Sequence, residues 1–322
     1  MGYINNKDGE FRTKYPSIKS IISIGGWTWS KDFSVVARDH NSRAKFSESV
    51  VDFIDKYGFD GVDVDWEFPV EGGDNKNTKD PSDGKNFVSL LTEIKNGLNK
   101  LASTKYQNSK KFEIGVAASA SIRINRHLDI KKISSIVDFI NIMGYDFSGS
   151  WSSKTNHASN LFDSKFTPPG VSIDRVVKYY LENGADSTKL IIGCPLHAVG
   201  FPISERVDIS KDLGLNKSIR NSITADLVKR SISYDELESY YQKNRGDVVK
   251  AYDTNAKATI LYNNKTNVLF SFDSSYSINN KLSYINSNNL GGMMFWDISK
   301  DSKQSFISSA HNYFKSHKRN KY

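Results

Sequence analysis

The sequence predicts an α/β fold in which helices cover a parallel sheet and a small α+β insertion interrupts the series. Short apolar runs alternate with helically spaced apolar residues from residue 21 to residue 194, and this alternation returns near residue 277. Repeated strand and helix pairs require a parallel sheet with covered faces, either doubly wound or closed as a barrel. The chain has 322 residues, 38% of them hydrophobic, so it can build a large core.

The repeated pairs can be followed along the chain. The first strand is expected at residues 21–24, where an apolar run stops at Gly25 and Gly26. A helix over residues 46–57 follows, because apolar residues recur there at helical spacing and Gly58 is placed to end it. A short helix at residues 15–19 is expected before the first strand. The later expected elements are strands at 60–67, 112–119, 137–144 and 190–194, and helices at 87–101, 129–135 and 173–180.

The alternation of strand and helix patterns stops between residues 201 and 275. A short helix that contains several tyrosines is expected at 234–241, and strand-like runs follow at 250–262 and 268–273. Helical spacing resumes at 277–286, before a strand at 291–296 and a final helix through 306–314. The sequence therefore predicts a main domain formed by residues 1–200 and 276–314, an α+β insertion domain at 201–275 and a basic tail at 315–322.

The charge, cysteine and histidine content of the chain indicates which partners and cofactors to expect. The net charge of +8 is spread along the chain except for a basic cluster at Lys315, Lys318, Arg319 and Lys321. A solvated tail explains this cluster better than a nucleic-acid arm, because no basic stripe interleaved with aromatic residues accompanies it. The single Cys194 excludes an intrachain disulfide, and the six histidines lack metal-site spacing. We expect no metal, no cofactor and no nucleic-acid partner.

Two observations bear on membranes and location. No run of about 18 apolar residues occurs, and Met1 opens onto polar sequence rather than an apolar signal segment. If Met1 is the true start, a cytoplasmic location is expected. Sequons at Asn216 and Asn264 point weakly to secretion, although such triplets arise often by chance in an asparagine-rich chain.

The most informative stretch is DGVDVDWEFP at residues 60–69. Alternate residues of a strand share a face, so Asp63, Asp65 and Glu67 point one way, about 6.6 Å apart, and the apolar residues between them point the other way. One interpretation is a strand whose polar face lies in water. A parallel sheet normally buries both faces, however, and three buried carboxylates are costly because like charges raise one another's pKa.

A fold tolerates that cost mainly where chemistry needs it, so we favour a functional interpretation. Glu67 lies at the carboxyl end of its expected strand, where βα folds build active sites. It is the natural proton donor, with Asp65 and Asp63 as a pair that tunes it.

Three other strand ends carry aromatic or hydroxyl side chains: Ser23–Trp27, Met143–Asp146 and Gly291–Trp296. Tryptophan and tyrosine stack on the apolar faces of pyranose rings, and phenol and carboxylate groups bind ring substituents. For any one of these aromatic residues alone a core role is at least as plausible. Three of them at strand ends favour a sugar cleft.

At these residues the sequence resembles glycoside hydrolase family 18, the chitinases, of the fungal and bacterial type with an insertion domain. The resemblance runs from about residue 14 to residue 302. The family pattern DGxDxDxE is met by residues 60–67, SxGGW by residues 23–27 and MxYD by residues 143–146. The combination of the three patterns is specific, whereas one alone would only be suggestive.

The resemblance implies a (β/α)8 TIM barrel that hydrolyses β-1,4-linked N-acetylglucosamine with retention, using the acetamide oxygen of the substrate in place of an enzyme nucleophile. Glu67 would protonate the glycosidic oxygen, Asp65 would hold the acetamide, and Asp63 would share its proton. Tyr145 would bind the acetamide oxygen as the fourth catalytic residue. The implied substrate-binding residues are Trp27, Met143, Asp146 and Trp296.

Two departures from the family pattern stand out. The family's GxPxYGR run appears as residues 193–199, with His197 and Val199 in place of a tyrosine and an arginine. In the family SxGGW closes the third barrel strand, yet here it begins at residue 23, so the barrel is expected to be incomplete, with about six strands. Either the true start lies upstream, or the chain is a truncated product.

These observations leave three functions open. The leading one is an endo-acting chitinase, and the others are a chitin-binding, lectin-like protein without turnover and an inactive remnant of a hydrolase. The intact Glu67 favours the enzyme. The expected partner is chitin or a chitooligosaccharide, with a monomeric chain if the barrel is complete, and the resemblance implies an extracellular location.

Overall fold

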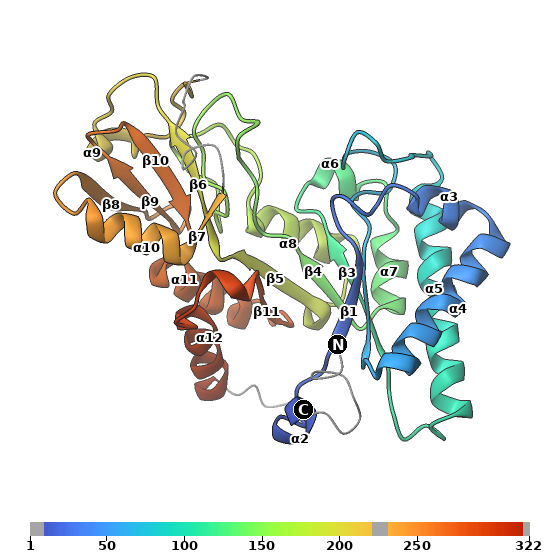
Figure 1. The fold of residues 1–322 in the computed structure, drawn as a ribbon. Coiled ribbons are helices and arrows are strands. Elements are labelled where there is room, and N and C mark those ends of the chain that lie inside the picture. The colour runs from blue at the N-terminus through green and yellow to red at the C-terminus, as the bar shows by residue number, and fades with distance from the viewer. Residues whose placement is uncertain (1–9, 221–230, 318–322) are drawn as a thin grey trace. The chain divides into compact units, whose positions relative to one another are not determined.

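A computed structural model describes residues 10–220 and 231–317 (Figure 1). The chain divides into two compact units. The first comprises Met1–Asn141 and Tyr180–Leu190, and the second comprises Ile142–Tyr179 and Ile191–Tyr322.

The first unit is built on parallel strands covered by helices. Its strands follow the order β1, β2, β3, β4, with bounds Ile21–Gly25, Gly61–Asp65, Glu113–Ala118 and Phe139–Ile142. Helices α3, α4 and α5 lie side by side against one another (Figure 1). The helical segments of this unit are α2 (Glu10–Lys14), α3 (Phe33–Arg38), α4 (His40–Tyr57), α5 (Asp83–Thr104), α6 (Ile122–Asn125), α7 (Ile130–Ile136) and the 3₁₀ turn η1 (Ser187–Lys189).

The ends of α4 show how the sequence sets local structure. The Asp39 side chain accepts a hydrogen bond from the backbone N–H of Ser42, which caps the first turn. Gly58 ends the helix at φ 73°, a left-handed conformation that glycine adopts without steric cost. The helix thus stops immediately before the strand that carries the acidic residues.

The core of the first unit is formed on the apolar face of β2. Val62 and Val64 are fully buried, and Trp66 is 1% exposed. The Trp66 ring stacks on Phe33 with centroids 5.4 Å apart and meets Phe87 edge to face at 5.5 Å. The predicted alternation is confirmed, although β2 ends at Asp65, two residues earlier than expected.

The second unit contains a parallel pair of strands, β5 (Leu190–Pro195) and β11 (Gly292–Trp296). The helices and 3₁₀ turn associated with it are α8 (Ile173–Glu182), α11 (Ser275–Ser287), η2 (Ile298–Lys300) and α12 (Ser305–Ser316). A fully buried ion pair joins Lys281 of α11 to Asp273, with Nζ 2.6 Å from the carboxylate. The same Nζ donates to Ser159 Oγ, which bonds the carbonyl oxygen of Gly144.

A separate antiparallel sheet in this unit has the strand order β7, β6, β10, β9, β8. One face packs on α10 (Tyr234–Lys243), and the other packs on apolar residues between Ile203 and Ile219, which include α9 (Ile209–Asp212). Both faces are therefore buried. The strand bounds are β6 His197–Pro202, β7 Ser231–Ser233, β8 Val248–Asp253, β9 Ala258–Asn263 and β10 Val268–Phe272.

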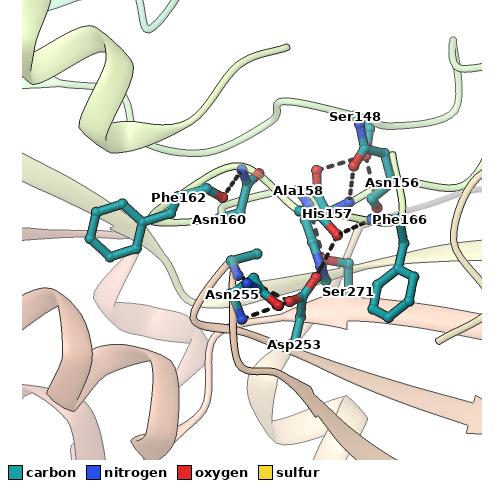
Figure 2. Close-up of polar contacts among 12 residues, drawn as sticks. Ser148, Asn156, His157, Ala158, Asn160, Phe162, Phe166, Asp253, Asn255 and Ser271 are labelled. Carbon is teal, nitrogen blue, oxygen red and sulfur yellow. Dashed lines mark hydrogen bonds and ion pairs between the residues drawn. The ribbon is translucent and has the colours of Figure 1, made fainter. Parts of the chain in front are cut away.

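A buried polar cluster ties this sheet to the preceding loop (Figure 2). The His157 ring nitrogen Nε2 lies 3.0 Å from Asp253 Oδ2, and both side chains are at most 1% exposed. Ser164 Oγ donates to the same carboxylate oxygen at 2.6 Å, while the N–H groups of Asn255 and Ala256 donate to the other. Asp253 is thus satisfied on both oxygens.

The predicted fold class is confirmed: six parallel strands are accompanied by a separate antiparallel α+β sheet. The proposed limits of the insertion domain and the tail stay predictions, and Lys318, Arg319 and Lys321 lie outside the described residues. In the part of the chain that the structure describes, no helix combines the length and apolarity needed to cross a membrane.

Two local predictions were wrong. The helix expected at residues 15–19 is instead α2 at Glu10–Lys14, and it ends before Pro16, which has no backbone N–H with which to continue the helical hydrogen bonds. The run at 250–262 is two strands, β8 and β9, joined by a turn in which Lys257 has φ 53°.

Candidate functional site

The acidic residues of the first unit lie at the carboxyl end of β2. Asp63 and Asp65 are partly buried on one face of the strand, opposite the core residues. Glu67 follows two residues beyond the strand end and is also partly buried. The structure therefore brings these three predicted residues together.

The neighbouring strand β1 is shaped to approach these acids. Ser23 pairs with Asp63 across the two strands, and its hydroxyl donates to the Asp63 carboxylate at 3.0 Å. Gly25 has φ 115°, and a Cβ there would lie 2.1 Å from the carbonyl oxygen of Asp65. Next to it, the Gly26 N–H donates to the same oxygen at 2.7 Å. Gly25 is needed because the β1 backbone lies against the Asp65 carbonyl, whereas Gly26 is favoured by its φ of 90°.

The electrostatics of the pair raise the pKa of both carboxyl groups. Burial raises the pKa of Asp63, and hydrogen bonds from Ser23 and Asn141 offset part of that rise. Burial, together with repulsion from Asp63, raises the pKa of Asp65 to about 6. Asp65 Oδ1 is buried and has no hydrogen-bond partner among the described residues. The charge therefore belongs mainly on Asp63 and the proton on Asp65.

Glu67 is held through its backbone by two side chains. Its N–H donates to Ser30 Oγ at 2.9 Å, and its carbonyl accepts from Asn77 Nδ2 at 2.7 Å. Ser30 is fully buried, and its hydroxyl also lies 2.8 Å from the Gly26 carbonyl oxygen. The sequence analysis did not predict Ser30 or Asn77 as site residues. The only signal for Ser30 is its position three residues after the SxGGW motif.

The remaining predicted site residues, apart from Trp27, belong to the second unit. Met143, Tyr145 and Asp146 directly follow β4, and Trp296 is the last residue of β11. The Leu196 N–H donates to the Trp296 carbonyl at 2.7 Å, which ties that strand end to the start of β6. We call these four residues, Met143, Tyr145, Asp146 and Trp296, the second group.

Large aromatic side chains are exposed in both units. In the first unit Trp27 is 52% exposed and Trp29 is 82% exposed. In the second unit Trp296 is 55% exposed and Trp151 is 69% exposed. Sequence reasoning predicted Trp27 and Trp296 as stacking residues and missed Trp29 and Trp151. The exposed faces of these tryptophans are of the kind that stacks on pyranose rings.

Residues 10–220 and 231–317 contain no group of three or more histidine, cysteine or acidic side chains arranged to hold a metal ion. Cys194 is fully buried, and burial raises the pKa of its thiol to about 12. It is therefore a poor nucleophile.

A parallel α/β fold in which two partly buried carboxylates on the second strand are followed by a glutamate is an arrangement typical of glycoside hydrolases. The comparison with known families agrees. The profile of glycosyl hydrolases family 18 matches residues 3–301, and the chain belongs to that family.

The chain is similar to known chitinases over most of its length. It is 34% identical over 303 residues to chitinase A1 of Niallia circulans, and the aligned region covers 92% of this chain and 42% of the relative. It is 32% identical over 300 residues to chitinase 1 of Aphanocladium album, covering 92% and 65% respectively. The chain thus spans between about two fifths and two thirds of these relatives' lengths.

A solved structure shows the same fold. The chitinase ChiW of Paenibacillus sp. str. FPU-7 superposes with a TM-score of 0.86 at 29% identity. The match covers 94% of this chain and 34% of that protein.

Proposed function

We propose that this chain hydrolyses the β-1,4 linkages of chitin and chitooligosaccharides with retention of configuration. The observation that carries the proposal is Asp65, whose buried Oδ1 has no hydrogen-bond partner among the described residues and whose pKa is raised to about 6 by burial and repulsion from Asp63. Membership of glycosyl hydrolases family 18 and similarity to proteins named chitinases support it.

The reaction follows from the chemistry of these groups. Glu67 donates its proton to the glycosidic oxygen as the acetamide oxygen of the same sugar bonds to C1 and the glycosidic bond breaks. A water molecule then adds to C1, Glu67 takes the water's proton, and the bond from the acetamide oxygen to C1 breaks. Two displacements at C1 leave its configuration unchanged.

Asp65 and Asp63 act on the acetamide group. A neutral acetamide oxygen is a weak nucleophile, and it becomes stronger when its N–H is held by a carboxylate. The unpartnered Oδ1 of Asp65 is the acceptor offered for that N–H. As charge develops on the acetamide, the proton moves toward Asp63, so negative charge grows on Asp65 where it is needed.

We propose further roles for the second group, which membership of the family supports. Tyr145 is proposed to donate its hydroxyl proton to the acetamide oxygen, and Met143 and Asp146 to contact the sugar substituents. Trp27 and Trp296 are proposed to stack on sugar faces, which their exposure supports.

The test is the exchange Glu67→Gln. Hydrolysis of chitotetraose should fall at least about a thousandfold, because the proton donor is lost while the side-chain shape is kept. Binding, measured by isothermal titration, should survive. The matched control is Glu113→Gln at the start of β3, where the glutamate pairs with Lys19, and it should leave turnover unchanged.

The outcome also separates the competing functions. Turnover in Glu67→Gln equal to wild type would remove Glu67 from its role. A wild-type chain that binds chitotetraose without cleaving it would be lectin-like, and one that does neither would be an inactive remnant. For endo-action, the viscosity of a soluble chitin derivative should fall well before reducing ends accumulate.

A further inference from the structure

His197 begins β6 in the second unit and contacts two predicted site residues. Its Nε2 lies 3.0 Å from Oδ1 of Asp146, and its ring meets the Tyr145 ring edge to face with centroids 6.3 Å apart. The His197 side chain is 5% exposed, whereas that of Asp146 is 50% exposed. Asp146 is therefore anchored on its buried side and open on the other.

The direction of this hydrogen bond follows from the chemistry of the partners. A carboxylate only accepts, so Nε2 of His197 carries the hydrogen and donates it. The other ring nitrogen, Nδ1, is buried and has no partner among the residues that the structure describes. A protonated Nδ1 would bury an unsatisfied donor, so the structure favours the Nε2–H tautomer.

The backbone of Asp146 has an uncommon conformation. Its φ is 56°, a left-handed conformation that residues other than glycine rarely adopt. Such a residue persists only when its surroundings hold it, and such positions cluster at ligand sites. The bond to His197 fixes the first carboxylate oxygen, and the exposed side of the carboxylate remains for a ligand.

The second departure in the same run has a different environment. Val199 is 6% exposed and packs in an apolar cluster with Phe201 and Ile260. It contributes to the core of the insertion sheet, whereas His197 holds the polar contact to Asp146.

We propose that His197 is a positioning residue that orients the Asp146 carboxylate, and through it the binding of sugar substituents, in this chain. The inference rests on the proposed function. It concerns a residue at which the chain departs from its family pattern, because a histidine that contacts Asp146 stands here in place of a tyrosine.

The test compares three exchanges at His197, with chitotetraose as substrate. His197→Phe keeps the ring but removes the donor, and it should raise KM about 10- to 100-fold with kcat reduced less than threefold. His197→Gln places an amide N–H near the former Nε2 and should restore KM to within about threefold of wild type. His197→Asn, whose amide is too short to reach Asp146, should behave like His197→Phe.

A double-variant cycle shows whether the effect passes through Asp146. If it does, adding His197→Phe to Asp146→Asn should change KM little, because the contact is already altered. A merely structural role would lower stability in all three His197 variants, yet it would not produce recovery in His197→Gln alone.

The outcomes separate this inference from the proposed function. An active wild type whose KM is unaffected by His197→Phe and His197→Asn overturns the inference and leaves the function standing. If the wild-type chain neither hydrolyses nor binds chitotetraose, the proposed function is refuted, and the proposed role of His197 in sugar binding is refuted with it. The Nε2–H tautomer, read from ¹⁵N shifts of the histidine ring, checks the contact independently, and an Nδ1–H tautomer would contradict it.

Discussion

The raised pKa of Asp65 predicts that its charge weakens the fold at neutral pH. The pKa is about 6 in the folded chain, against an ordinary value of 3.8, because of burial and repulsion from Asp63. A group with a raised folded pKa contributes its full share of stability below the unfolded pKa, and that share is lost as pH rises through about 6. The difference corresponds to about 3 kcal/mol.

Asp65→Asn removes this penalty because the amide has no charge to bury. At pH 7.5 the variant should be more stable than wild type by about 3 kcal/mol, and the difference should vanish near pH 4. The assay is urea unfolding at half-unit steps between pH 4 and pH 8, with the free energy of unfolding compared at each step. The same variant should lose hydrolysis, since the acceptor for the acetamide is replaced.

Asp60 supplies a matched control one residue before the same strand. Burial raises its pKa, but hydrogen bonds from Arg12 and from the Ser20 N–H outweigh burial and lower the pKa below its ordinary value. Asp60→Asn should therefore destabilise the fold at neutral pH, with the loss shrinking as pH falls below about 4. The reasoning fails if Asp65→Asn is less stable than wild type at pH 7.5, or if its effect does not change with pH.

Two further predictions concern stability. Burial raises the pKa of Asp253, but hydrogen bonds, first that of His157, outweigh burial and lower this pKa to about 2. Asp253→Asn should therefore reduce the free energy of unfolding by about 2.5 kcal/mol at pH 7, and this loss should shrink as pH falls from 5 toward 2. A loss of stability that stays constant in urea unfolding across these pH values would contradict this. Gly25→Ala should cost about 3 kcal/mol or more, because the new Cβ would lie 2.1 Å from a backbone oxygen. Gly246→Ala is its control, because no atom of the described residues would lie within 4 Å of the added Cβ, and equal urea midpoints for the two variants would refute the argument.

The sequence predicted those parts of the site that depend on alternation within one strand. The apolar residues of β2 face the core, and the acids face the other way, because side chains of a strand alternate regardless of the rest of the fold. The sequence predicts a strand end at Gly25 and Gly26, but the close approach of Gly25 to the Asp65 carbonyl follows only from the pairing of β1 with β2.

Contacts between segments distant in the sequence were not predictable in this way. Ser30 meets the backbone of Glu67 across 37 positions, and His197 meets Asp146 across 51. Neither pair has a local pattern, since the partners are brought together by strand order and loop path. The run at 250–262 was read as one strand, although Asp253 and Asn255 offered a turn signal within it.

The contrast between Asp60 and Asp65 shows how one strand serves both folding and chemistry. At the amino end, Asp60 receives an arginine and a backbone N–H, so its charge stabilises the fold. At the carboxyl end, Asp65 lies beside a second acid and has a buried oxygen that no residue of the described part of the chain hydrogen-bonds, so its charge opposes folding. Satisfied groups elsewhere, such as Asp253 with its four donors, offset that cost. Substitutions that supply Asp65 with a protein donor should therefore stabilise the chain and reduce turnover together, because the donor would occupy the oxygen that the substrate needs.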